Sequence, residues 1–191
     1  MRLWLVTAFL ALPTAGLLLP AGRDLDGRLV AAAAEATRQN SILEETMQLA
    51  TKLGSREPVL LALFLPAAFG TAAARLTAGV AFAGVAGNQL AAAGLKAIVG
   101  RDRPDGGSER RNSSFPSAHA SGIAGLAWIV SLRHRRWGPW MLLLALWISS
   151  SRVFLERHYV SDVLAGALLG IWFAALALHW QGRISSWIRP R

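Results

Sequence analysis

Residues 160–180, VSDVLAGALLGIWFAALALHW, carry a single charged side chain, Asp162, close to their start. A helix needs about 20 mostly apolar residues to cross the hydrocarbon core of a bilayer, and this stretch supplies them. Five further stretches qualify or nearly qualify, at 3–20, 58–74, 76–99, 117–132 and 138–152. The sequence therefore predicts an all-α integral membrane bundle of about six transmembrane helices.

The composition of the whole chain agrees with a membrane protein. Of its 191 residues, 53% are hydrophobic and only 16% are charged, whereas a soluble domain carries about 25% charge. A single domain, residues 1–191, accounts for the length. The chain has no cysteine, which excludes disulfides, thiolate metal sites and cysteine nucleophiles. Its net charge of +9 gathers at the ends of apolar segments, which favours anionic lipid headgroups or an anionic substrate over nucleic acid.

The N-terminal third allows more than one interpretation. We predict that the stretch at 3–20 is a retained helix, with a cleaved secretory signal peptide in residues 1–22 as the alternative. Residues 23–57 are rich in charge, and their apolar side chains fall partly at helical spacing. This segment is predicted to be an extramembrane or interfacial amphipathic helix. It could act as a lid or a substrate guide, although a solvated connector is the simpler interpretation.

Three motifs with reactive side chains fall at the ends of the predicted spans. Residues 96–104 end the third span, residues 116–119 open the fourth, and residues 151–162 join the fifth to the sixth. In a bundle of alternating spans, all of these ends lie on the same membrane face. The topology therefore predicts that the three motifs meet in one site.

The motifs bring three cations, Lys96, Arg103 and Arg152, to this site. At an effective dielectric constant of about 20 and a separation of roughly 6 Å, each like-charged pair repels by about 3 kcal/mol. Such a cluster is stable only around an anion. Arginine also offers planar bidentate donors that suit phosphate oxygens. The cluster therefore predicts a phosphate site.

The second motif is typical of a helix start. Proline is tolerated in the first turn, as at Pro116, and Ser117 is available as a cap. The free backbone amides of Ala118 and His119 would then face the phosphate, because a helix N-terminus binds anions. The imidazole of His119 would be placed to protonate a departing alkoxide.

The third motif pairs a second histidine with a carboxylate. His158 and Asp162 are four residues apart, which predicts that they share one helical face. The carboxylate would accept a hydrogen bond from one imidazole nitrogen and leave the other free to attack. His119 and His158 could then divide the work between general acid and nucleophile, without a metal or another cofactor. The alternative is that the two histidines are metal ligands.

Other charged residues near the motifs carry no clear signal. Arg101, Asp102 and Glu156 cannot be distinguished from solvated loop charges. His134 and His179 are predicted to lie at the opposite membrane face, and we assign them no catalytic role.

The motifs resemble the three-part signature of the type 2 phosphatidic acid phosphatase (PAP2) superfamily. That signature is Lys, six residues, Arg-Pro; then Pro-Ser-Gly-His; then Ser-Arg, five residues, His, three residues, Asp. The chain departs from it at one position, where Ala118 replaces glycine. The matching residues are Lys96, Arg103, Pro104, Pro116, Ser117, His119, Ser151, Arg152, His158 and Asp162.

The resemblance implies a role for each matching position. His158 would form a phosphohistidine and Asp162 would orient it, while His119 would protonate the leaving group and later activate water. The residues implied in phosphate binding are Lys96, Arg103, Ser117, Ala118 and Arg152.

Together, the motifs and the spans predict a metal-independent lipid phosphatase that hydrolyses a phosphomonoester or a pyrophosphate. The candidate substrates are undecaprenyl pyrophosphate, phosphatidylglycerol phosphate, phosphatidate and a lipid A phosphate. One alternative is a phosphotransferase that uses the same phosphohistidine. Another is a non-enzymatic anion transporter or channel. A vanadium haloperoxidase is disfavoured, because six apolar spans suit a lipid substrate better than a soluble oxidant.

The distribution of charge predicts the orientation. With the N-terminus inside, the connections around Arg75 and residues 133–136, and the tail at 183–191, carry basic residues and no acidic ones. We therefore predict that these segments are cytoplasmic, although the opposite face holds more basic residues in total. The protein would lie in a bacterial cytoplasmic membrane, with its active site on the extracytoplasmic face.

Overall fold

The computed structural model describes residues 3–107 and 113–182, and this part of the chain is helical and contains no strand. Its longer helices are α1 (Leu3–Leu18), α2 (Pro20–Arg38), α3 (Ser41–Leu53), α4 (Arg56–Phe69), α5 (Ala72–Val99), α6 (Ala118–Arg133), α7 (Gly138–Phe154) and α8 (Val160–His179). A short 3₁₀ turn, Arg135–Trp137, joins α6 to α7. The all-α prediction is thus confirmed. The predicted cytoplasmic tail at 183–191 lies outside the described residues.

Two helices, α5 and α8, are long and apolar enough to cross a membrane. The pair of α1 and α2 passes the same test as one span that is bent by 99°. The remaining apolar helices α1, α4, α6 and α7 contain 16, 14, 16 and 17 residues, and a full crossing takes about 17 to 25. The membrane character is therefore clear, whereas the count of six spans stays a prediction.

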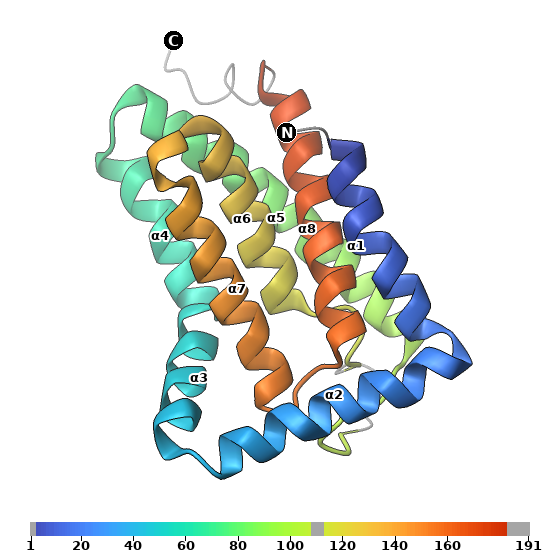
Figure 1. The fold of residues 1–191 in the computed structure, drawn as a ribbon. Helices are drawn as coiled ribbons and strands as arrows, with labels where there is room; N and C mark the ends of the chain where they lie inside the picture. Colours follow the sequence, from blue (N-terminus) through green and yellow to red (C-terminus); the bar gives the residue numbers. More distant parts are fainter. Residues whose placement is uncertain (1–2, 108–112, 183–191) are drawn as a thin grey trace.

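Helix α6 lies at the centre of the bundle. Helices α5, α7 and α8 pack around it, α1 packs on α8, and α4 packs on α5 (Figure 1). Side chains from five of these helices, α4 to α8, meet in one apolar core, which includes Val80, Ile129, Ile148 and Ala174. Between α5 and α6, the buried Ser121 hydroxyl donates to Asn88 Oδ1 at 3.1 Å. A buried polar pair of this kind ties helices together where no water can compete.

Helices α6 and α8 approach each other closely because of Gly166 and Gly170, one turn apart on α8. A Cβ atom at Gly166 would lie 2.4 Å from the carbonyl oxygen of Ser117, and one at Gly170 would lie 1.9 Å from that of Ser121. Small residues at this spacing let helix backbones touch in membrane bundles. The backbone amide of Ser117 also donates to the Asp162 carbonyl at 3.0 Å. The second and third motifs are therefore held side by side.

The segment at 23–57 differs from its prediction as a single helix. Helix α2 runs across one end of the bundle, and α3 turns up along α7 (Figure 1). The chain changes direction at Asn40, whose side chain accepts a hydrogen bond from the Leu43 amide at 3.1 Å and so caps α3. Because α2 buries Asp26, Val30, Ala34 and Thr37, the segment is docked on the bundle and is not a solvated connector.

Candidate active site

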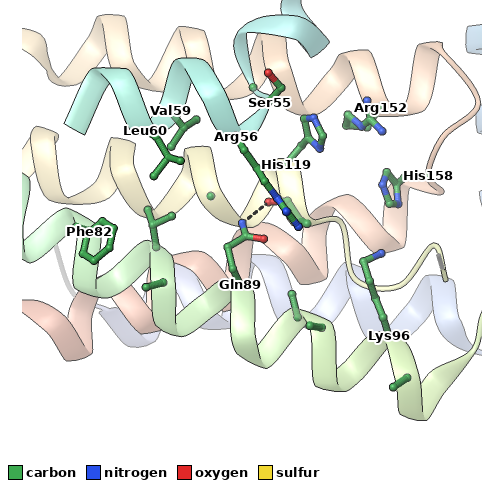
Figure 2. Close-up of a pocket in the computed structure, with 18 of the residues that line it drawn as sticks. Ser55, Arg56, Val59, Leu60, Phe82, Gln89, Lys96, His119, Arg152 and His158 are labelled. Carbon is green, nitrogen blue, oxygen red and sulfur yellow. Dashed lines mark hydrogen bonds between the residues drawn. The ribbon is translucent and has the colours of Figure 1, made fainter. Parts of the chain in front are cut away.

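The three motifs converge at the end of the bundle that α2 crosses. Lys96 lies in the last turn of α5, His119 in the first turn of α6 and Arg152 in the last turn of α7. These three residues, with Arg103 and His158, line one cavity of about 670 Å³. Figure 2 shows Lys96, His119, Arg152 and His158 around this space. The structure thus brings together both histidines and all three predicted cations.

The other predicted site residues lie at or behind the cavity wall. Ala118 lines the cavity, and its carbonyl oxygen accepts a hydrogen bond from Gln89 at 3.0 Å. Ser117 is fully buried and does not belong to the described residues that line the cavity. Its hydroxyl accepts a hydrogen bond from the Ala120 amide at 3.4 Å. Asp162 is also fully buried, behind His158. In this geometry the Ser117 side chain caps α6, as the sequence predicted, and its contact with phosphate stays a prediction.

The pairing of His158 with Asp162 differs from its prediction. Helix α8 begins at Val160 after its cap residue Tyr159, so His158 lies in the preceding loop and the prediction of a shared helical face is wrong. His158 Nδ1 is 3.8 Å from Asp162 Oδ2, which is too long for a direct hydrogen bond. The same nitrogen lies 2.6 Å from the carbonyl oxygen of Ser114. Asp162 Oδ2 instead accepts from the Tyr159 amide at 2.9 Å.

This geometry fixes the protonation of the His158 ring. A carbonyl oxygen can only accept a hydrogen bond, so Nδ1 carries the proton and Nε2 keeps its lone pair. Burial lowers the pKa of His158 below its ordinary value, and the Asp162 carboxylate opposes that shift. Burial therefore favours the neutral form of the ring.

The cations of the site are partly held by neighbours. Arg152 donates from Nη1 to the Thr51 hydroxyl, and Lys96 Nζ donates to the Ser113 carbonyl. Within the part of the chain that the structure describes, Arg152 Nε is buried and has no hydrogen-bond partner. A buried donor that lacks an acceptor costs about 1–3 kcal/mol. A phosphate oxygen in the cavity is an acceptor of the right kind for it.

Sequence reasoning missed several residues of this site. Arg101 donates from Nη1 to Asp162 Oδ1 at 2.7 Å and from Nη2 to Asp26 Oδ2 at 3.1 Å. Ser114 orients His158, yet it stands before the recognisable second motif. Arg56 at the start of α4 also lines the cavity, and Figure 2 shows its side chain directed toward Gln89. None of these residues had a motif or a spacing that could have identified it.

Two residues near the motifs proved to be peripheral, in agreement with the absence of a signal. Glu156 forms an exposed ion pair with Arg38 at 3.0 Å. Asp102 contributes its backbone carbonyl, which accepts from the Ser114 hydroxyl at 3.0 Å.

The cavity continues into an apolar groove between α4 and α5. A second cavity, of about 910 Å³, shares Leu60 and Phe82 with the first. Its lining is almost entirely apolar and includes Leu61, Leu63 and Phe64. Leu60 and Phe82 are 50% and 55% exposed on the bundle surface. The site therefore has a cationic end and an apolar end that opens to the side of the bundle.

Comparison with known proteins gives one family. The model of the PAP2 superfamily matches residues 80–186, a segment that contains all three motifs. The lipid A 1-phosphatase of Rhizobium johnstonii is 30% identical over 109 residues, which cover 51% of this chain and 43% of that protein. The lipid A 4'-phosphatase of Bacteroides thetaiotaomicron is 32% identical over 98 residues, 44% of each chain.

Two further proteins are similar to this chain. The bacitracin transport permease protein BcrC of Bacillus licheniformis is 36% identical over 77 residues, 40% of this chain and 37% of that protein. The matched segments thus span less than half of each of these three relatives. The crystal structure of a transmembrane PAP2-type phosphatidylglycerolphosphate phosphatase from Bacillus subtilis superposes with a TM-score of 0.74 and 22% identity, and covers 95% of this chain and 96% of that one. The fold extends over nearly the whole molecule.

Proposed function

The chain belongs to the PAP2 superfamily, and from this premise we propose that it is a membrane phosphatase that removes phosphate from a lipid. The observation that carries the proposal is the cavity in which His119 and His158 lie among Lys96, Arg103 and Arg152. Two imidazoles among cations, His158 neutral for attack and His119 protonated as the acid, suit the transfer of a phosphoryl group from a leaving oxygen to water.

We assign the bond-making steps to the two histidines. Nε2 of His158 attacks phosphorus, and the bond from phosphorus to the lipid oxygen breaks as His119 protonates that oxygen. His119 then takes a proton from a water molecule, whose oxygen attacks the phosphohistidine. This releases inorganic phosphate and restores the neutral ring of His158. Ser114 and Asp162 hold that ring while positive charge develops on it.

The cations act on the phosphoryl oxygens. Lys96, Arg103 and Arg152 neutralise charge that spreads over these oxygens in the transition state, as phosphoryl transfer requires. The buried Nε of Arg152 gains its missing acceptor there. The backbone amides at the start of α6, at Ala118 and His119, add the positive end of a helix.

The apolar groove supports a lipid as the substrate. A headgroup phosphate at the cationic end would leave the acyl or prenyl chains to lie along Leu60 and Phe82, between α4 and α5. The names of two relatives support lipid A phosphate as a candidate, and that of the structural neighbour supports phosphatidylglycerol phosphate. Undecaprenyl pyrophosphate and phosphatidate complete the set that we propose to test, with the site on the extracytoplasmic face of a bacterial membrane.

The function is tested by phosphate release from the purified protein in detergent. We expect release from at least one of the four candidate lipids, at the same rate with and without EDTA, because two histidines and three cations supply the chemistry. Loss of activity in EDTA would contradict the metal-independent mechanism. The absence of release, with phosphate or lipid phosphate moving across proteoliposomes, would favour a transporter. Phosphate transferred to an added alcohol would reveal a phosphotransferase.

The groove makes a separate prediction about chain length. Replacing Leu60 with tryptophan fills the passage that joins the two cavities, so long-chain substrates should lose contacts that short-chain ones never make. We expect kcat/KM for a long-chain lipid phosphate to fall at least tenfold, which corresponds to the free energy of burying about two methylene groups. The dioctanoyl substrate should be little affected. Leu142, which is 57% exposed on α7, offers the control Leu142→Trp. Equal losses for both chain lengths, or in both variants, would rule out the groove as the chain-binding surface.

A further inference from the structure

A buried ionic cluster links helix α2 to the start of α8. Its members are Asp26 on α2, Arg101 in the loop after α5, and Ser161 and Asp162 in the first turn of α8. Both carboxylates are fully buried, while the Arg101 side chain is 18% exposed. No part of the family signature includes Asp26 or Arg101.

The Arg101 guanidinium makes three hydrogen bonds and one contact with an aromatic ring. Its Nη1 donates to Ser161 Oγ at 2.6 Å and to Asp162 Oδ1 at 2.7 Å. Its Nη2 donates to Asp26 Oδ2 at 3.1 Å. The Tyr159 ring lies against the guanidinium, with its centroid 4.0 Å from Cζ. The guanidinium therefore has little freedom to leave Asp162.

Asp26 also holds the start of α8 directly. Its Oδ1 accepts from the Ser161 backbone amide at 3.3 Å, and its Oδ2 accepts from the Ser161 hydroxyl. That amide belongs to the first turn of α8, where backbone donors have no partner within the helix. A carboxylate at this end is also favoured by the helix dipole. Asp26 thus caps α8 from another helix, two residues after the cap residue Tyr159.

The contacts of Asp26 and Arg101 affect the His158 ring through Asp162. Arg101 donates to Asp162 Oδ1. The other oxygen, Oδ2, accepts from the Tyr159 amide and lies 3.8 Å from Nδ1 of His158. If Arg101 shifted, the carboxylate could rotate, and its charge would move relative to the ring. Asp26 is the one group outside the loop and α8 that fixes Arg101 among the described contacts of its guanidinium.

We propose that Asp26 is a positioning residue for the phosphatase reaction, which acts through Arg101 and Ser161 on Asp162 and His158. The inference rests on the proposed function for its effect on turnover, and on the geometry alone for its effect on the His158 ring. It gives the docked helix α2 a role, because α2 then completes the support of the proposed nucleophile.

The first test compares kcat and KM for dioctanoyl phosphatidate in detergent. Asp26→Asn keeps the shape of the side chain but removes its charge and one acceptor oxygen. We expect kcat to fall about 10- to 100-fold, the usual effect of losing a partner that orients a reacting group. We expect KM to stay within about twofold, because the phosphate-binding cations are untouched.

Two matched variants on α2 separate positioning from folding. Asp24→Asn removes a carboxylate that pairs only with Arg28 in an exposed i,i+4 bridge at 2.6 Å. Thr37→Val removes a buried anchor whose hydroxyl contacts the Phe154 carbonyl at 3.3 Å and no group of the cluster. Both should keep the wild-type kcat. If Thr37→Val lowers kcat as much as Asp26→Asn does, general docking of α2 explains the effect and the proposal is wrong.

The double variant tests the route of the effect. If Asp26 acts largely through Arg101, the loss in kcat of Asp26→Asn combined with Arg101→Gln should be well below the product of the two single losses. Losses that multiply would show that the two residues act independently, and would overturn the assigned route.

The last measurement does not depend on turnover. Nitrogen-15 NMR of labelled histidine reports which ring nitrogen of His158 carries the proton, with His158→Ala supplying the assignment. We expect the Nδ1-protonated form in the wild type and in Asp24→Asn, and a shifted or mixed form in Asp26→Asn. An unchanged His158 signal in Asp26→Asn would overturn the proposal, even if the chain proved to have no phosphatase activity. Conversely, the wild type could prove inactive while the His158 signal still changes in Asp26→Asn. That result would contradict only the proposed function.

Discussion

Replacing His158 with alanine is expected to abolish phosphate release and to prevent any covalent capture of phosphate by the protein. In another hydrolase class, removal of the nucleophile costs on the order of 10⁶ in kcat, and we expect a loss on that scale because no other described imidazole lines the cavity except His119. The neutral state of the buried ring and its free Nε2 are the features that make His158 the candidate.

The covalent step can be observed directly. Wild-type protein mixed with a lipid labelled with ³²P in its terminal phosphate and quenched in alkali within milliseconds should carry label that is stable in base and lost in acid, as a phosphoramidate is. His158→Ala should carry none. The control His179→Ala alters an exposed histidine at the far end of α8 and should label like the wild type. Labelling of His158→Ala, or near-normal turnover by it, would remove His158 from the mechanism.

The main features of the fold follow from patterns that lie along the chain. The stretch at 160–180 contains a helix, Val160–His179, within one residue of its predicted end, because a nearly uncharged run of that length has few other stable conformations in a membrane. The convergence of Lys96, His119 and Arg152 followed from the alternation of spans. Contacts between distant segments had no such signal. In the sequence, Asp26 is one of several charged residues in 23–57, and nothing there predicts that it is buried when α2 docks on the bundle.

The pair of His158 and Asp162 shows where spacing misleads. They are four positions apart, and this spacing is typical of a shared helical face, yet the helix begins between them at Val160. Asp162 is used instead as a cap for the Tyr159 amide and as a partner for Arg101. The hydrogen-bond partner of the imidazole comes from Ser114, 44 positions earlier in the chain. Its identity depends on the return of Ser114 to the end of α5, where its amide donates to the Arg101 carbonyl at 2.8 Å, and no local pattern specifies that contact.

Replacing His119 with alanine is expected to slow hydrolysis of a lipid phosphate by about 10²–10⁴, the usual contribution of a positioned general acid. The size of the loss should depend on the leaving group. A lipid alkoxide is a strong base and needs a proton as it departs, whereas p-nitrophenolate is stable without one. We therefore expect His119→Ala to hydrolyse p-nitrophenyl phosphate with a much smaller defect in the first, phosphohistidine-forming step.

Pre-steady-state kinetics separates the two roles that we propose for His119. With p-nitrophenyl phosphate, the variant should release a rapid burst of p-nitrophenol and then turn over slowly, because the same imidazole is needed to activate water in the second step. Added imidazole, which can enter a cavity of about 670 Å³, should restore part of the slow phase. A defect of equal size in the burst for both leaving groups would contradict protonation by His119. It would instead favour a role for this residue in binding phosphate at the start of α6.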